Sequence, residues 1–170
     1  MSTSNAQPLP SERSTKGPFR LALAMVIVTT VTILWGALTT STGSGLAFAD
    51  WPLSDGELMP ERSYTTLPGF FEHFHRLFAS LAGLMSLALA VWLQAKGLGD
   101  AKARATAWFG GCLILTQGVI GGVGVLKGLP AATSVTHGTL AQLTLATFVW
   151  ATRTVRTPCG RTLVTPSSCS

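Results

Sequence analysis

Four long apolar runs constrain what this chain can fold into more than any other feature. They lie at about 19–40, 73–93, 105–126 and 132–152. A helix of about 20 residues, rising 1.5 Å per residue, is about 30 Å long, which is the thickness of the hydrocarbon core of a bilayer. Charged side chains enter these runs only at Arg20 and Arg76. The pattern therefore predicts an all-α integral membrane protein, a bundle of four transmembrane helices.

The composition excludes several other classes of protein. Only 11% of the 170 residues are charged, against about 25% in soluble domains, while 47% are hydrophobic and 18 residues are glycine. These proportions argue against a soluble enzyme, a coiled coil and a disordered chain, and they suit helices in a membrane. The three cysteines, Cys112, Cys159 and Cys169, have neither zinc-site nor disulfide-framework spacing, so they indicate no redox compartment.

The basic residues predict how the helices are oriented. Nine of the twelve fall on one side of the predicted bundle: Arg13, Lys16, Arg20, Lys96, Lys102, Arg104, Arg153, Arg156 and Arg161. Because basic residues favour the cytoplasmic side, we expect both termini in the cytoplasm and the loop 41–71 outside. The net charge of +5 reflects this orientation in the lipid bilayer of the inner cell membrane, and we expect no nucleic-acid partner.

The domain organisation follows from the same runs. We expect a disordered cytoplasmic tail at 1–18, a multi-pass four-helix domain at 19–152 and a second cytoplasmic tail at 153–170. A secretory signal peptide is the alternative for the first run, since Ala47 and Ala49 resemble a cleavage site. We disfavour it because the run is too long and ends well before those alanines.

Histidine is the most informative residue type for chemistry in this chain. His75 lies just inside the outer end of the second run, and His137 lies at a similar depth in the fourth run. Two intramembrane imidazoles at matched depth suit axial ligation of a heme iron from opposite faces. For either histidine alone, an interhelical hydrogen bond remains the alternative.

Glu72, His75 and Arg76 are spaced i, i+3 and i+4, so they project from one face of the second helix. Arg76 needs an anionic partner inside the membrane, and both a heme propionate and Glu72 itself meet that need. His73 is rotated by about 100° from this face, and we expect it at the membrane interface rather than as a ligand. The side chains of His73 and His75 diverge on a helix because the two residues are two positions apart, which disfavours a zinc or copper site made by the pair.

Glycine and tryptophan carry weaker signals. The spacing Gly118-x-x-x-Gly122 in the third run predicts a close helix approach, and glycines also leave room for a flat ring. Packing without a cofactor remains the alternative. Four tryptophans fall near run ends or in the outer loop, as in an aromatic belt, and we assign them no chemistry: Trp51, Trp92, Trp108 and Trp150.

Taken together, the motifs resemble those of the heme A synthase family over about residues 20–152, in the family's order and spacing. The matching segments are Thr42-Gly-Ser-Gly-Leu46, Asp50-Trp-Pro-Leu53, Glu72-His-Phe-His-Arg76 and Gln117-Gly-Val-Ile-Gly-Gly122 with Val125, followed by His137. The resemblance implies an oxidoreductase that converts the C8 methyl of heme O to a formyl group, giving heme A for cytochrome oxidase. It implies Glu72 as the catalytic carboxylate, His75 and His137 as heme-iron ligands and Arg76 as a heme-binding residue.

The resemblance also implies the molecules that this chain meets. The cofactor is heme, as heme B, as the substrate heme O, or as both. Heme O synthase and cytochrome oxidase assembly proteins are candidate partners. Two other functions stay open: a bis-histidine b-type membrane cytochrome that transfers electrons, and a non-catalytic heme-handling assembly factor.

The chain departs from the family pattern in two respects. The usual member has eight helices in two similar halves, so this chain resembles a half-length member, and a homodimer would restore the two-fold arrangement. Many bacterial members carry a cysteine pair in the outer loop, where this chain has Phe48 and Ser54. We therefore expect no thiol chemistry at that loop.

Overall fold

The computed structural model describes residues 15–156, which form four long helices and one short helix. Their bounds are α1 Lys16–Ser41, α2 Arg62–Thr65, α3 Leu67–Lys96, α4 Ala101–Leu126 and α5 Ala131–Arg156. The all-α prediction is confirmed for this part of the chain. The helices extend beyond the predicted runs, because α3 begins at Leu67 and α5 continues to Arg156. The remainder of both predicted tails, with Cys159 and Cys169, lies outside the described residues.

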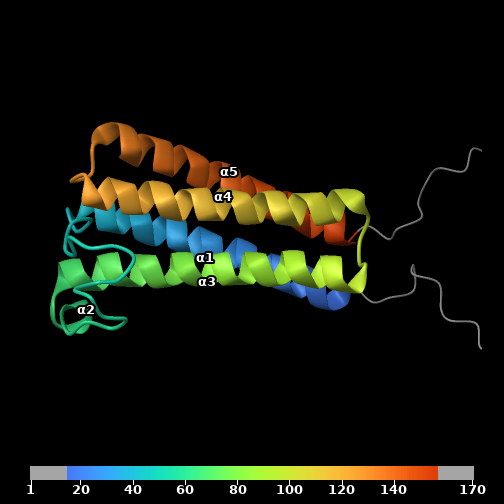
Figure 1. Cartoon of the computed structure of the whole chain (residues 1–170), viewed down its shortest axis with the longest axis horizontal. Coiled ribbons are helices and arrows are strands. Elements are labelled where there is room, and N and C mark those ends of the chain that lie inside the picture. The colour runs from blue at the N-terminus through green and yellow to red at the C-terminus, as the bar shows by residue number, and fades with distance from the viewer. Residues whose placement is uncertain (1–14, 157–170) are drawn as a thin grey trace, which may run out of the picture.

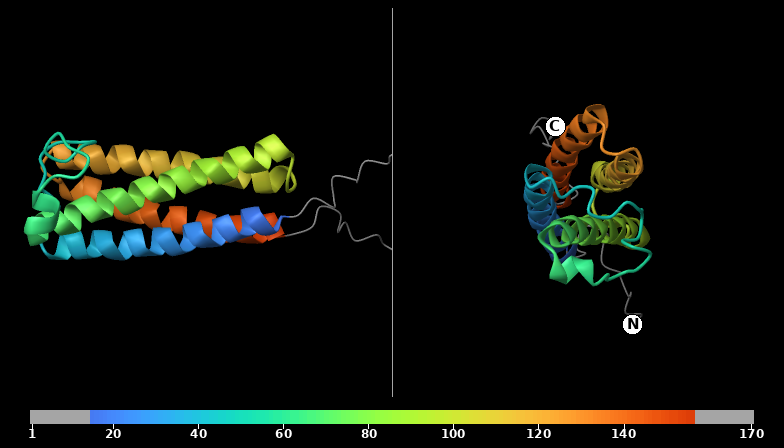
Figure 2. Two further views of the ribbon diagram at one scale, coloured as in Figure 1. Left: turned by 90° about the horizontal axis from the view of Figure 1, so that it is seen from below. Right: turned by 90° about the vertical axis from the view of Figure 1, so that its left-hand side faces the viewer.

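The four long helices run up and down side by side, and each contacts two neighbours (Figure 1). Helix α1 packs against α3 and α5, and α4 packs against the same two helices. Helices α3 and α5 are therefore diagonally opposite across the bundle, as the end-on view in Figure 2 shows. This arrangement lets side chains from α3 and α5 meet on the bundle axis.

Local signals in the sequence set where the helices begin and end. Thr66 caps α3 by accepting a hydrogen bond from the Gly69 amide at 3.2 Å, and Asp100 caps α4 through the Ala103 amide at 2.7 Å. Helix α3 ends at Gly97, whose φ of 60° is the left-handed conformation that glycine adopts without strain. The connection between α3 and α4 is therefore short, and it fixes them as antiparallel neighbours.

The two ends of the bundle differ in what fills them. Residues from all four long helices form one apolar cluster in the half near the described termini, including Met25, Leu89, Ala107 and Phe148. The other half holds the histidines and is covered by residues 42–66, which we call the outer loop and which include α2. Packing of the first half thus leaves the second half available for polar side chains.

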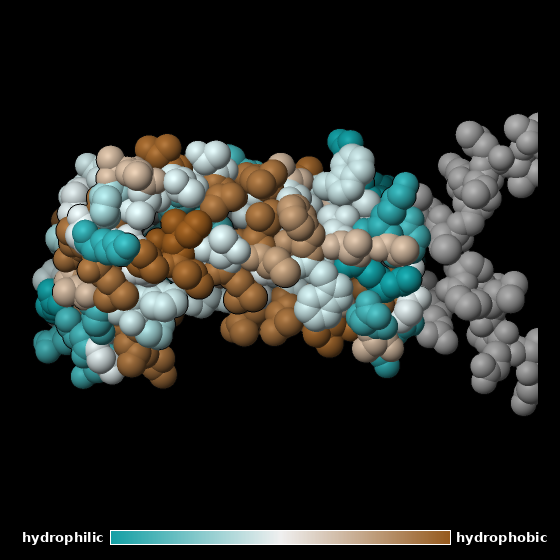
Figure 3. Space-filling model, turned by 45° about the horizontal axis from the view of Figure 1, so that its top comes forward, coloured by the Kyte–Doolittle hydropathy of each residue, from teal (hydrophilic) through white to brown (hydrophobic). Residues whose placement is uncertain are grey.

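The outside of the bundle is apolar along its middle, where many large hydrophobic side chains are exposed (Figure 3). Among the described residues, three helices are long and apolar enough to cross a membrane: α1, α3 and α4. The chain is therefore a membrane protein, and helix α5 is less apolar than the other three long helices.

The two glycines of the predicted spacing in α4 differ in their contacts. Gly118 is exposed, and a Cβ atom added there would meet no heavy atom within 4 Å, so the predicted close helix approach at this residue is wrong. Gly122 is buried, and a Cβ added there would clash with Cδ2 of Trp51 in the outer loop. A close approach to another helix occurs at Gly110, where an added Cβ would lie 2.6 Å from Cε1 of Phe148 in α5. Glycine spacing alone does not say which face of a helix meets its neighbour.

This difference predicts opposite outcomes for two alanine substitutions in α4. Gly110→Ala should destabilise the bundle by about 1–3 kcal/mol through overpacking against Phe148, and should lower the melting temperature by about 2–12 °C. Gly118→Ala should leave it unchanged or slightly raised, since alanine favours the helix. Thermal unfolding of both purified variants in detergent measures this, and equal melting temperatures would contradict the packing.

Candidate functional site

The candidate site is built around two histidines on the diagonal helices α3 and α5. The ring centroids of His75 and His137 lie 6.4 Å apart, with their planes at 80°. The prediction that the two imidazoles lie at matched depth is therefore confirmed. Each comes from a different helix hairpin, so the pair joins the two halves of the bundle.

Each imidazole packs over a glycine of the neighbouring helix. A Cβ added at Gly36 in α1 would lie 2.7 Å from Cε1 of His75, and one added at Gly121 in α4 would lie 3.1 Å from Cε1 of His137. The two glycines therefore make the space that the rings occupy. The sequence does not single out Gly36, because a lone glycine in an apolar run gives no sign of what faces it.

The two rings differ in their hydrogen bonds. Nδ1 of His75 lies 3.1 Å from the Thr32 carbonyl oxygen of α1, which leaves Nε2 as the nitrogen available for a ligand. The alternative of an interhelical hydrogen bond thus holds for one nitrogen of His75. Nδ1 of His137 is buried with no hydrogen-bond partner of normal geometry. An unsatisfied buried nitrogen in a membrane helix calls for an explanation beyond packing.

The separation of the two rings suits a heme iron held between them. With an iron–nitrogen bond of about 2 Å and about 1.1 Å from nitrogen to ring centre, two imidazoles that held an iron would have centroids about 6.2 Å apart. Among the described residues, no group of three or more His, Cys, Asp or Glu side chains is placed to hold a metal ion. Two imidazoles suffice when a porphyrin supplies the other four ligands, so the donor set suits heme better than a bare metal ion.

One turn outward from His75, Glu72 is 3% exposed and forms an ion pair with Arg76. Nη2 of Arg76 donates to Oε1 of Glu72, and the Phe48 amide donates to Oε2 at 3.0 Å. Of the two anionic partners that the sequence leaves open for Arg76, Glu72 is the one that it contacts. Both carboxylate oxygens are thereby satisfied inside the protein.

Arg76 also holds the outer loop. Its Nη1 donates to the carbonyl oxygens of Asp50 at 2.8 Å and Leu53 at 2.5 Å, and its Nη2 donates to that of Phe48 at 3.3 Å. Both terminal nitrogens of the guanidinium are engaged by these contacts and by Glu72. The ion pair therefore fixes the loop to α3 directly above the histidine pair.

Phe48 is the centre of the folded outer loop. Its ring is fully buried, with the guanidinium of Arg62 at 4.9 Å and that of Arg76 at 5.8 Å from the ring centroid. Arg62 forms an exposed ion pair with Asp55 at 2.6 Å, which adds little stability by itself. Cation–π contacts and burial of Phe48 carry the packing of this loop.

His73 and Trp51 both make buried contacts that involve the outer loop. His73 is 3% exposed, and its Nδ1 lies 3.1 Å from Oγ of Ser54, while its predicted position at the membrane interface stays a prediction. The outer loop folds back over α3 and covers it. Trp51 packs its indole ring against Gly122 of α4, where an added Cβ would clash with it. The loop therefore reaches from α3 across to α4.

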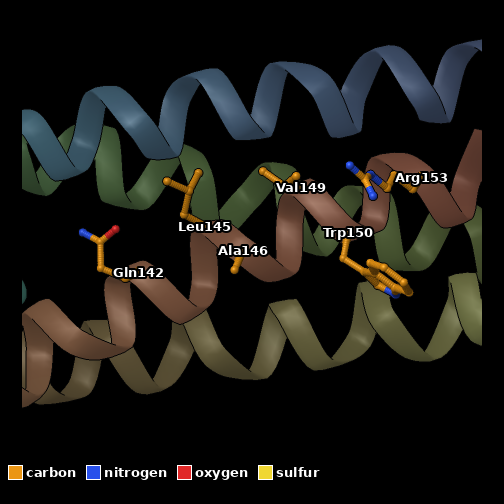
Figure 4. Close-up of a pocket in the computed structure, with 6 residues that line it drawn as sticks. All are labelled: Gln142, Leu145, Ala146, Val149, Trp150 and Arg153. Carbon is orange, nitrogen blue, oxygen red and sulfur yellow. The ribbon is translucent and has the colours of Figure 1, made fainter.

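A groove of about 500 Å³ lies on α5, away from the histidine pair. It is lined by side chains along one stripe of that helix: Gln142, Leu145, Ala146, Val149, Trp150 and Arg153 (Figure 4). These positions lie between His137 and the end of α5 near the described C-terminus. The groove is thus separate from the candidate site and opens toward the surroundings of the bundle.

The comparisons of this chain with known proteins agree on one family. The profile of a family described as cytochrome oxidase assembly protein matches residues 19–167. The chain is 32% identical over 118 residues to the heme A synthase of Symbiobacterium thermophilum, with 69% of this chain and 38% of that protein covered. It is 35% identical over 122 residues to that of Alkalihalophilus pseudofirmus, with 70% and 40% covered. No solved structure is significantly similar to it.

A third relative, the heme A synthase of Rhizorhabdus wittichii, is 31% identical over 144 residues, with 79% of this chain and 40% of that protein covered. The chain thus spans about 40% of the length of the curated relatives it matches.

The outer loop should depend on pH through Asp50. Its carboxylate accepts hydrogen bonds from the amides of Asp55 at 2.9 Å and Gly56 at 2.8 Å. Partial burial acts to raise the pKa of Asp50, but these amides and the charge of Arg76 outweigh it and hold the pKa below its ordinary value. A depressed carboxyl pKa stabilises the loop above about pH 4, and this stability is lost as pH falls through the folded-state pKa.

We expect hydrogen exchange of the amides in residues 50–57, corrected for intrinsic rates, to stay constant from pH 7 to 5 and to accelerate below about pH 4. Asp50→Asn should show the accelerated exchange already at pH 7. Asp55→Asn, which removes only an exposed ion pair, serves as the control and should change exchange far less. Equal protection in Asp50→Asn and the parent protein at pH 7 would contradict this role.

Proposed function

The chain belongs to the cytochrome oxidase assembly protein family, and from this membership we propose that it is an enzyme of the heme A synthase type. The proposed reaction is oxidation of the C8 methyl of heme O to a formyl group, which supplies heme A to cytochrome oxidase. The observation that carries the proposal is the facing pair His75 and His137 with the buried carboxylate of Glu72 one turn away.

His75 and His137 are proposed to hold a heme iron from opposite faces. Their 6.4 Å separation and the free Nε2 of His75 support this assignment. A bound heme, whether heme B or the substrate heme O, supplies redox chemistry that no protein side chain offers. Gly36 and Gly121 leave the space against α1 and α4 that the two rings occupy.

Glu72 is proposed as the catalytic carboxylate. Oxidation of a methyl to a formyl group releases protons, and a buried carboxylate beside the site can accept a proton or stabilise developing positive charge. Arg76 and the Phe48 amide fix its two oxygens, so the group is oriented before a substrate arrives. Both terminal nitrogens of Arg76 already donate hydrogen bonds within the protein. Its Nε is therefore the nitrogen that would contact a heme propionate.

We also propose that α5 crosses the membrane as a fourth span. It has 26 residues, as do α1 and α4, and it packs against both. Its lower apolarity comes largely from threonines. Thr133 donates to the carbonyl oxygen of Pro130 just before the helix, and six others donate to carbonyl oxygens of their own helix: Thr136, Thr139, Thr144, Thr147, Thr152 and Thr154. Hydroxyls satisfied in this way do not oppose transfer into lipid as free hydroxyls do.

The orientation with both termini in the cytoplasm is proposed from charge. Lys16, Lys96, Lys102 and Arg156 lie at one end of the bundle, while the outer loop lies at the other (Figure 1). The positive-inside rule then places the loop and the histidine half on the outer side of the inner cell membrane. A site on that side would act on heme within the outer leaflet.

We further propose a homodimer as the working unit, with heme O synthase and cytochrome oxidase assembly proteins as its partners. The proposal follows the two similar halves of the usual family member, because the described residues form one four-helix half with one histidine pair. Two copies related by a two-fold axis would provide two such pairs. A native mass of a single chain in detergent would overturn the dimer.

A bis-histidine electron carrier is the second candidate, because the histidine pair alone would serve it. A non-catalytic heme-handling factor is the third. Neither has an evident need for a carboxylate one turn from a ligand. Glu72 therefore separates these functions from the enzyme.

We expect expression in a host that makes heme O but no heme A to yield heme A or its hydroxylated precursor. Extracted hemes, separated chromatographically with mass detection, measure this. Glu72→Gln should keep bound heme but lower product by about 100-fold or more, since it removes the carboxylate. Glu57→Gln, an exposed loop residue, is the matched control and should keep full output. Unmodified heme alone from the parent chain would favour the electron carrier or the handling factor.

The glycine beneath His75 gives a second test that needs no turnover. Gly36→Ala should push the imidazole off its position and weaken binding of hemin by about 10-fold or more, with loss of the bis-histidine absorption spectrum. Gly138→Ala, beside His137 but with no heavy atom within 4 Å of the added Cβ, should bind normally. Titration of purified protein with hemin measures both. Normal binding by Gly36→Ala would argue against His75 as a ligand.

A further inference from the structure

We propose that His73 and Ser54 form a tether that closes the outer loop onto α3 and thereby positions Glu72. The two side chains are 3% and 2% exposed, and they join residues 19 positions apart across the loop. Neither touches the histidine pair in any contact of the described chain. They act through Arg76, so we class them as positioning residues.

The contacts form a continuous chain from the loop to the carboxylate. Nδ1 of His73 lies 3.1 Å from Oγ of Ser54, and Nη1 of Arg76 donates to the same Oγ at 3.4 Å. Since Arg76 can only donate, the Ser54 hydroxyl proton is free to point to His73. Arg76 in turn donates to Glu72. Ser54 therefore connects two residues of α3 that point to different sides of the helix.

This connection attaches the outer loop to a second side of α3. His73 follows Glu72 by one position, so it projects about 100° around α3 from the face that carries Glu72 and Arg76. The contacts of Arg76 and Glu72 hold the loop on one side of α3. The bond from Ser54 to His73 adds an attachment on another side of the same helix, which restricts the loop's orientation further.

The orientation of the outer loop also affects its contacts with α4. Trp51, three residues before Ser54, packs on Gly122 of α4, and the adjacent Gly121 packs under His137. Release of Ser54 would free this stretch and expose the Phe48 backbone that holds both Arg76 and Glu72. The inference rests on the proposed function only in giving Glu72 its catalytic role, because the tether itself is a property of the loop.

Trypsin measures closure of the loop directly. Arg62 is the only lysine or arginine within residues 42–66, and the next residue, Ser63, is fully buried, so cleavage after Arg62 requires the loop to open. Lys127, in the exposed turn between α4 and α5, provides an internal reference cut. The ratio of the two initial cleavage rates, read by mass spectrometry on the full chain in detergent, reports opening independently of heme.

Four variants and one control define the test. Ser54→Ala and His73→Phe each remove one end of the tether, His73→Asn restores an amide near the Nδ1 position, and the double variant of the first two tests coupling. Ser44→Ala is the matched control, because Ser44 is a buried loop serine whose hydroxyl contacts only Thr42 in its own turn. Ser54→Ala keeps the test possible if His73→Phe fails to fold.

We expect the cleavage ratio to rise about 5- to 30-fold in Ser54→Ala and His73→Phe, as for loss of a buried hydrogen bond, and no further in the double variant. His73→Asn should return it toward the parent value, and Ser44→Ala should not change it. Hemin binding should stay normal while heme A output falls. Unchanged ratios, or effects that multiply in the double variant, would overturn the tether, and unchanged heme A output with a raised ratio would overturn its positioning role.

If the parent chain forms no heme A, the cleavage ratios still decide the tether, and only the proposed function is lost.

Discussion

The buried ion pair of Glu72 and Arg76 is the interaction on which the outer half of this molecule depends. Two charges taken out of water cost several kcal/mol each unless their remaining donors and acceptors are satisfied. Arg76 meets this requirement with three backbone carbonyls and Glu72 with one amide, all from the outer loop. The folded loop therefore supplies the hydrogen bonds that stabilise the ion pair, and the ion pair in turn holds the loop in its folded conformation.

The apolar half of the bundle makes this polar half possible. Small residues such as Ala103 and Ala107 let α3, α4 and α5 approach closely around Leu89 and Phe148, which sets the helix directions without polar contacts. The outer half of the bundle then holds His75 and His137 opposite one another across the diagonal between α3 and α5, with their ring centroids 6.4 Å apart.

The sequence predicts the histidine pair well because depth in a membrane can be counted. Alternate helices of an up-and-down bundle begin on the same side, so residues at similar distances from the starts of two such helices lie at similar depth, and His75 and His137 satisfy that condition. The sequence predicts Glu72 as a partner of Arg76, but its backbone partners could not be predicted, since carbonyls in an irregular loop leave no periodic signal. The burial of His73 could not be predicted for the same reason: it comes from the loop above it and not from its own helix face. Gly118 was misplaced because spacing defines a stripe but does not say what the stripe faces.

The placement of the ion pair bears on function as well as on folding. Apolar side chains of similar volume often replace a buried ion pair with no loss of stability, so stability alone does not explain one. An electron carrier needs two ligands and an apolar surround, and the Gly36 and Gly121 contacts already hold those ligands. A carboxylate fixed by Arg76 one turn from His75 adds an oriented acceptor for protons, which methyl oxidation requires and electron transfer does not. The cost of burying Glu72 is therefore most easily understood if the carboxylate takes part in the reaction.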